Sequence, residues 1–267
     1  MTTLGVVCRP QVPPERIRDV VLAAEDAGLD ELWLWEDCFW GGAVPACAAA
    51  LAWTSRVRVG IGVLPVPLRH VVTTAMDAAL LHRLFPDRVM IGVGHGVQSW
   101  MKQTGAAAES PVTLLREYLT ATRALLRGEK VTLAGRYVRL DEVALEWPPP
   151  APVPVLSAAS GDRTLRLSGE VADGTILEAG ADPDAIRRAR SLIDEGRARG
   201  NRADEHRLIV NLSVPGVSAA DAAEAATRVR AAAAAGAGAV ALHSADAGAA
   251  DPVDLVRFAA TQVRPLL

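Results

Sequence analysis

Short apolar runs alternate with longer amphipathic or alanine-rich segments along the whole chain. Runs of four to eight apolar residues bounded by turn residues predict buried strands, and apolar positions three and four apart predict helices. The predicted strands are Leu4–Cys8, Glu31–Trp35, Val57–Leu64, Arg88–Val93, Val153–Ser157, Gly174–Leu177, Leu208–Leu212 and Ala239–Leu242. The predicted helices are Pro14–Ala27, the later part of Gly41–Trp53, Arg69–Leu84, Val112–Leu126, Asp162–Ser168, Asp182–Arg199, Ser218–Ala234 and Asp251–Val263.

Capping residues support several of these helix boundaries. Asp182 followed by Pro183 is a typical helix start, and Ser218 with Asp221 three residues later is a variant of the capping box. Two short runs, Val131–Leu133 and Tyr137–Leu140, predict a small hairpin before the fifth strand.

Strands that alternate with helices pair in parallel, and eight such units close into a barrel. An open doubly wound sheet is the competing fold, but it has about five or six core strands and would leave elements over. We therefore predict an α/β protein with a single (β/α)8 TIM-barrel domain over residues 1–267 and a hairpin insertion.

Composition excludes several classes of protein. The 267 residues include 28 Lys and Arg against 31 Asp and Glu, a net charge of −3 without a basic block, so nucleic acid is a poor partner. Three cysteines without a C-x-x-C pair argue against disulfides or structural zinc. The start of the chain has no signal-peptide pattern, and the longest apolar stretch, Cys38–Trp53, is interrupted by glycine and proline. We expect a cytoplasmic protein with no membrane partner.

In a barrel of this kind the chemistry lies at the carboxyl ends of the strands. The most informative end is Ile91–Met101, where Gly92, Gly94 and Gly96 alternate around His95. Bare backbone lets a flat or charged ligand approach closely, although a tight turn at the rim explains the glycines equally well. The spacing differs from the dinucleotide-binding G-x-G-x-x-G pattern, because the third glycine comes one position early.

The fifth predicted strand runs through small residues into a helix. Backbone N–H groups at a helix start can hold a phosphate, and Arg163 adds a positive charge there. The alternative is simple capping of that helix by Ser160 or Asp162.

Two other strand ends have unusual composition. Gly60 and Gly62 lie within one strand, which indicates either a bulge or close packing. Glu36 and Asp37 follow a tryptophan-rich strand, and alternation along a strand predicts that at most one of them faces a pocket.

No P-loop, G-x-S-x-G, H-E-x-x-H or EF-hand motif is present, and the five histidines have no metal-ligand spacing. A nucleophile paired with a base cannot be identified, and no metal site is expected. A barrel of this composition is typical of enzymes in which a bound cofactor supplies the reactive chemistry.

The chain resembles the luciferase-like monooxygenase superfamily, in particular its deazaflavin-dependent (coenzyme F420) branch. That branch includes methylenetetrahydromethanopterin reductase and F420-dependent glucose-6-phosphate dehydrogenase. The matching segments follow the family's order to about residue 180. They are Ala23–Asp30 with Trp33 and Asp37, Arg58–Pro65 with Arg69 and His70, Phe85–Gly96, Val153–Gly161 and Ala172–Gly174.

The resemblance implies that F420, or FMN as the alternative, binds at the mouth of the barrel. It implies a non-prolyl cis peptide at Gly62–Val63, bulging against the cofactor ring, and catalytic roles for Asp37 and His95. The cofactor-binding residues implied are Gly62, Val63, Leu64, Gly94 and Gly96 for the ring, and Ala158, Ala159, Ser160, Gly161 and Arg163 for its phosphate.

The chain departs from the sugar-phosphate dehydrogenases where they bind substrate. Cys38 stands where they carry His, Val97 where they carry an acidic residue, and their phosphate-binding lysine has no counterpart at 178–182. Glucose 6-phosphate is therefore a poor candidate substrate. Trp40, Trp100 and Met101 could instead line an apolar pocket, although core packing explains them about as well.

The leading hypothesis is an oxidoreductase that transfers a hydride between F420 and an apolar small molecule. The alternatives are an FMN-dependent monooxygenase of the same superfamily, a phosphosugar-binding barrel and a non-catalytic barrel that acts as a binding protein. The resemblance also implies a homodimer, since barrels of this family often dimerise, and the alanine-rich segments Ala46–Ala52 and Ala222–Ala235 offer flat surfaces for packing.

Overall fold

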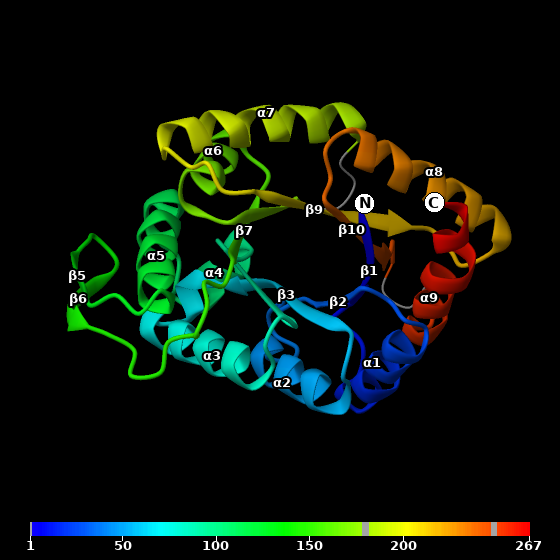
Figure 1. The fold of residues 1–267 in the computed structure, drawn as a ribbon, viewed down its shortest axis with the longest axis horizontal. Coiled ribbons are helices and arrows are strands. Elements are labelled where there is room, and N and C mark those ends of the chain that lie inside the picture. The colour runs from blue at the N-terminus through cyan, green and yellow to red at the C-terminus, as the bar shows by residue number, and fades with distance from the viewer. Residues whose placement is uncertain (1, 178–181, 247–249) are drawn as a thin grey trace.

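Eight parallel strands form a closed barrel in the computed structural model, which describes residues 2–177, 182–246 and 250–267 (Figure 1). The strand order around the barrel is β1-β10-β9-β8-β7-β4-β3-β2, so the predicted barrel is confirmed and the open sheet is wrong. The strands are β1 Thr3–Cys8, β2 Glu31–Leu34, β3 Arg58–Pro65, β4 Val89–Gly94, β7 Val155–Ala159, β8 Gly174–Leu177, β9 Arg207–Val214 and β10 Ala239–Ser244.

Helices cover the outside of the barrel (Figure 1). They are α1 Ile17–Asp26, α2 Ala43–Trp53, α3 Val71–Leu84, α4 Gln98–Gln103, α5 Pro111–Leu126, α6 Asp162–Val171, α7 Pro183–Arg199, α8 Ala219–Ala234 and α9 Pro252–Phe258. The sequence pattern did not predict α4, because six residues are too few to show helical periodicity. None of the helices in the described part of the chain is long and apolar enough to cross a bilayer.

The caps predicted for two helices are present. The Asp182 carboxylate accepts a hydrogen bond from the N–H of Ala185 at 2.7 Å, and Ser218 and Asp221 form a reciprocal capping box. The hairpin is also present, as β5 Val131–Ala134 and β6 Arg139–Val143. Its turn is anchored to α5, where Glu117 accepts hydrogen bonds from the N–H groups of residues 136–138 at 2.8–2.9 Å.

The barrel interior is filled by side chains rather than open. Trp33 lies at its centre, 1% exposed, and packs with Met90, Leu156 and Ile209. A Cβ atom at Gly60 would lie 2.4 Å from the Trp33 ring, so no larger residue fits there. Packing therefore explains Gly60.

The amino-terminal end of the barrel is closed by a buried carboxylate. Glu31 is fully buried and accepts hydrogen bonds from the Trp33 indole at 3.0 Å and from Arg58 at 2.9 Å. Thr3 and Arg207 also contact it. The buried Glu31 carboxylate is thus paired with hydrogen-bond donors and cations, as a charge in an apolar interior requires.

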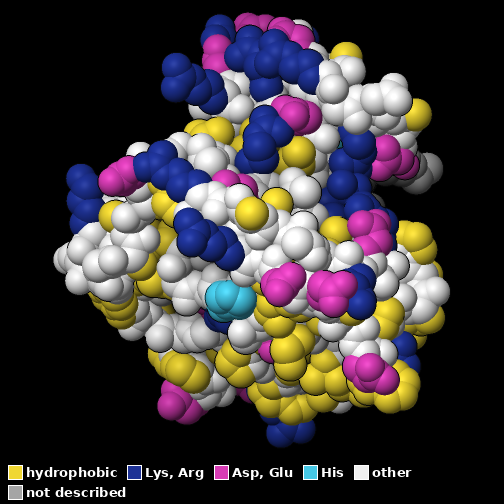
Figure 2. All heavy atoms as spheres, turned by 90° about the vertical axis from the view of Figure 1, so that its left-hand side faces the viewer, with side chains coloured by type: hydrophobic (Ala, Val, Ile, Leu, Met, Phe, Trp, Pro, Cys, Tyr) yellow, Lys and Arg dark blue, Asp and Glu magenta, His cyan; other side chains and the backbone are white. Residues whose placement is uncertain are grey.

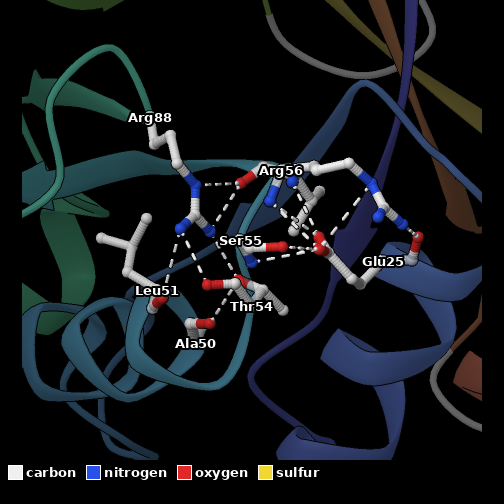
Figure 3. Close-up of polar contacts among 8 residues, drawn as sticks. Glu25, Ala50, Leu51, Thr54, Ser55, Arg56 and Arg88 are labelled. Atoms are coloured by element: carbon white, nitrogen blue, oxygen red, sulfur yellow. Dashed lines mark hydrogen bonds and ion pairs between the residues drawn. The ribbon is translucent and has the colours of Figure 1, made fainter.

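A second polar cluster at this end fixes the entry into β3 (Figure 3). The Glu25 carboxylate accepts hydrogen bonds from the N–H groups of residues 55–57 at 2.9–3.2 Å and from the Ser55 hydroxyl. Arg88 donates to the carbonyls of Thr54 and Val57. Burial opposes ionisation of Glu25, but the donors outweigh it and lower its pKa to about 2.

Candidate functional site

A cavity of about 750 Å³ opens at the carboxyl ends of the strands, within the size range of small-molecule sites. The ends of β2, β3, β4, β7, β8 and β9 line it, together with α4 and the first turns of α5 and α6. Ten of the predicted site residues lie in its wall: Asp37, Gly62, Val63, His95, Gly96, Trp100, Met101, Ala158, Ala159 and Ser160.

The other five predicted residues lie elsewhere. Leu64 points into the core between strands and helices, and Gly94 is buried behind the wall. Gly161 and Arg163 are exposed at the start of α6, and Trp40 is 54% exposed outside the lining. Their contacts with a cofactor stay predictions. Glu178, at the end of β8, lies outside the described residues.

The predicted irregularity in β3 is present. The Gly62–Val63 peptide bond is cis, and the pairing of β3 with β4 shifts register between Ile61 and Leu64. The Val63 side chain leans onto β4, since Cβ atoms at Gly92 and Gly94 would lie 2.9 and 2.8 Å from its methyl groups.

This packing corrects the interpretation of the alternating glycines. The Val63 side chain packs against the bare backbone of Gly92 and Gly94, so close packing between strands explains both glycines without a ligand. Gly96 is different, because its φ of +67° belongs to the left-handed turn that leads into α4.

The start of α6 forms part of the cavity wall through Ala158, Ser160 and Thr164. No side chain caps this helix, and its first internal hydrogen bond runs from the N–H of Leu165 to Gly161. The N–H groups of residues 162–164 therefore have no partner within the helix. The Asp162 carboxylate contacts Arg188 instead, at 2.9 Å, so capping by Ser160 or Asp162 is wrong.

Both carboxylates after β2 line the cavity, contrary to the expectation that only one would. The strand ends at Leu34, so alternation between faces no longer applies beyond it. Glu36 is neutralised by Arg69, at 2.7 and 3.0 Å, and accepts a hydrogen bond from the N–H of Ala43. Asp37 has no such partner in the described part of the chain, and burial raises its pKa while Arg9 partly offsets the shift.

His95 lies in the turn between β4 and α4. Its Nε2 atom is 3.3 Å from the Thr164 hydroxyl of α6. Burial lowers the pKa of the imidazole, which favours the neutral ring at neutral pH.

Sequence reasoning missed several lining residues. Trp35 and Ile176 follow the inward alternation of Trp33 and Gly174, which was a usable signal. Thr164, Gln98 and Pro111 reach the cavity only because the fold brings three helix starts together. Asn211 lies at a predicted strand end but carries no motif. The lining described here contains no Lys or Arg.

Comparisons with known proteins agree with this architecture. The family model described as luciferase-like monooxygenase matches residues 2–261. A 5,10-methylenetetrahydromethanopterin reductase of Methanolobus tindarius is 30% identical, over 68% of this chain and 56% of the relative. An F420-dependent glucose-6-phosphate dehydrogenase of Nakamurella multipartita is 31% identical, over 76% of this chain and 64% of the relative. The chain thus spans less than two thirds of the length of either curated relative.

Among solved structures, the coenzyme F420-dependent tetrahydromethanopterin reductase of Methanopyrus kandleri superposes with a TM-score of 0.83. The superposition covers 99% of each chain at 19% sequence identity, a level at which the similarity shows the fold alone.

Proposed function

Because the chain belongs to the luciferase-like monooxygenase family, we propose that it is an oxidoreductase that transfers a hydride between coenzyme F420 and an uncharged, largely apolar small molecule. One curated relative and one solved structure are F420-dependent by name. The observation that carries the proposal is a single cavity wall in which the Val63 bulge lies near the uncapped start of α6.

The residues present fit such a cofactor. Val63 and Ile176 give an apolar surface suited to a planar ring. The N–H groups of residues 162–164, with the helix dipole behind them, suit an anionic tail, and Ser160 adds a hydroxyl. When bound, a deazaflavin would supply hydride acceptance and donation. The protein itself would bind and orient the cofactor and the substrate, and it would exclude water from the site.

Two side chains could handle a proton in this cavity. His95 is held neutral by burial, with Thr164 at its Nε2 atom. Asp37 has a raised pKa and no paired cation at hydrogen-bond distance. Both are therefore candidates for general acid or base, the role that perturbed groups in a cleft commonly have.

The charged residues of the cavity lining favour an uncharged substrate. A phosphate or carboxylate needs a cation or several donors, and the lining holds no Lys or Arg. Cys38 remains a protonated thiol, because burial and then the charges of Asp37 and Glu36 raise its pKa. The lining also includes the apolar side chains of Val97, Trp100 and Met101.

The direct test is titration of the purified protein with F420 and, separately, with FMN, followed by absorbance and fluorescence. We expect saturable binding of F420 at micromolar concentration. Tight binding of FMN alone would indicate the monooxygenase, and binding of neither would support a non-catalytic barrel. Ser160→Asp should weaken F420 binding about tenfold by repelling the anionic tail, whereas Thr73→Asp, the same charge change on exposed α3, should not.

The chain is further proposed to form a homodimer. Met76, Leu80 and Leu84 follow one another at helical spacing on the outer face of α3 and are each 58–60% exposed. Figure 2 shows hydrophobic side chains gathered towards the lower edge, the side on which α2, α3 and the loop after β6 lie in Figure 1, and charged ones at the top, near α7. The alanine-rich α8 has exposed charges, so α3 is the better interface. Light scattering should show a dimer that Leu80→Arg converts to a monomer.

A further inference from the structure

Asn211 is a buried polar residue that the proposed function leaves unused. It lies in β9, is 7% exposed, and lines the cavity. Its side chain makes no hydrogen bond with any residue that the structure describes. Both polar atoms of the amide are reached from the cavity rather than enclosed in the core, so their hydrogen bonds are made by whatever occupies the cavity. An amide kept in this position is therefore suited to pair with a molecule that enters the cavity.

The position of β9 in the barrel determines which molecule that is. Three strands lie between β9 and β3 in either direction around the barrel, so Asn211 and Val63 belong to opposite walls (Figure 1). Ile209, two residues earlier, packs in the barrel interior, which is consistent with Asn211 pointing inward above it. Since the cofactor is proposed to lie against Val63 of β3, Ile176 of β8 and the start of α6, β9 is left for the substrate.

The chemistry of the amide narrows the substrate further. An amide donates and accepts hydrogen bonds but cannot neutralise a charge, and the described lining of the cavity has no Lys or Arg that could do so. The matching ligand group is an uncharged oxygen on an otherwise apolar body. We propose that the Asn211 amide recognises the carbonyl or hydroxyl oxygen of the substrate, which is therefore a ketone, an aldehyde or an alcohol. This inference rests on the proposed function only for the place of the cofactor.

The test uses two probes of the same shape, cyclohexanone and methylenecyclohexane, of which only the ketone accepts a hydrogen bond. Their dissociation constants are measured by ligand-observed NMR, with the protein both free of cofactor and loaded with F420. Asn211→Leu should weaken binding of the ketone relative to the alkene roughly three- to tenfold compared with wild type, the effect of one neutral hydrogen bond. F420 affinity should not change.

Thr122→Val is the matched control. Thr122 is fully buried in α5, its hydroxyl has no partner in the described part of the chain, and it lies outside the cavity lining. It should leave the ratio of ketone to alkene dissociation constants unchanged, and both variants should keep the wild-type circular dichroism spectrum.

An Asn211→Leu variant with the same ratio of ketone to alkene dissociation constants as wild type would overturn the inference. Loss of F420 affinity in Asn211→Leu, with that ratio unchanged, would assign the amide to the cofactor instead. Failure of F420 to bind at all would overturn the proposed function, while the cofactor-free titration would still decide the role of Asn211.

Discussion

The two ends of the barrel hold their buried polar groups in opposite ways. At the amino-terminal end Glu31 is surrounded by Trp33, Arg58 and Arg207, and each contact is a hydrogen bond or ion pair. At the carboxyl end Asn211 and Asp37 line a cavity without such partners among the described residues. The paired polar groups close the barrel and stabilise it, whereas the polar groups without a protein partner are available to bind a ligand. This division is the one expected of a barrel enzyme.

The largest expected effect is the loss of the Glu31 charge. Glu31→Ala leaves the Trp33 indole without an acceptor and Arg207 and Arg58 without a partner; because both arginines are partly exposed, we expect a loss of about 3 kcal/mol of unfolding free energy, the lower end of the cost of breaking a buried ion pair. Urea denaturation followed by circular dichroism measures it. The same truncation at exposed Glu224 on α8 should change stability by less than about 0.5 kcal/mol. A Glu31→Ala variant within 1 kcal/mol of wild type would contradict this view of the closed end.

Two glycines test the same difference between the closed and the open end of the barrel, by adding side-chain volume instead of removing charge. Gly60→Ala forces a methyl group to within 2.4 Å of the Trp33 ring, and overpacking of this kind costs about 1–3 kcal/mol. Gly161→Ala is the matched control at the open end, since no atom lies within 4 Å of its added methyl group. Equal thermal stability of the two variants would show that the interior is not tightly packed at Trp33.

The buried histidines give the closed end a pH dependence. His206 is 3% exposed, its Nε2 atom is 2.8 Å from the Thr175 hydroxyl, and burial lowers its pKa to about 4. Well above pH 6.5 the ring is neutral in both states, so its titration does not affect stability. As pH falls from 6.5 to about 4, the unfolded chain binds the proton first, and stability drops by about 1 kcal/mol per pH unit. The unfolding free energy of His206→Gln should fall less steeply over this range.

How far the sequence predicts the molecule depends on how local each feature is. The helix starts at Asp182 and Ser218 were predictable because a cap involves only three or four neighbouring residues. The strand count was predictable because each buried strand is an apolar run bounded by turn residues.

Features that depend on two strands or on distant helices could not be predicted. The sequence predicts a ligand contact at Gly94, and nothing in its own strand shows that Val63 of the neighbouring strand packs against it. The contact between His95 and Thr164 joins residues 69 positions apart and exists only because β4 and β7 are neighbours in the barrel.

The smallest expected effect on stability is that of removing the Asp37 charge. Its sign is opposite to the effect of removing the Glu31 charge at the other end of the barrel. Burial raises the pKa of Asp37, so ionisation is less favourable in the folded chain than in the unfolded one. The resulting penalty is present at neutral pH and disappears as pH falls below the ordinary value near 3.8, where both states are protonated. Asp37→Asn should therefore raise the unfolding free energy at pH 7, by less than about 1 kcal/mol because the side chain is partly exposed, and have no effect at pH 3. A carboxylate whose removal stabilises the fold is kept for binding or catalysis, so a destabilised Asp37→Asn protein would instead class Asp37 with Glu31.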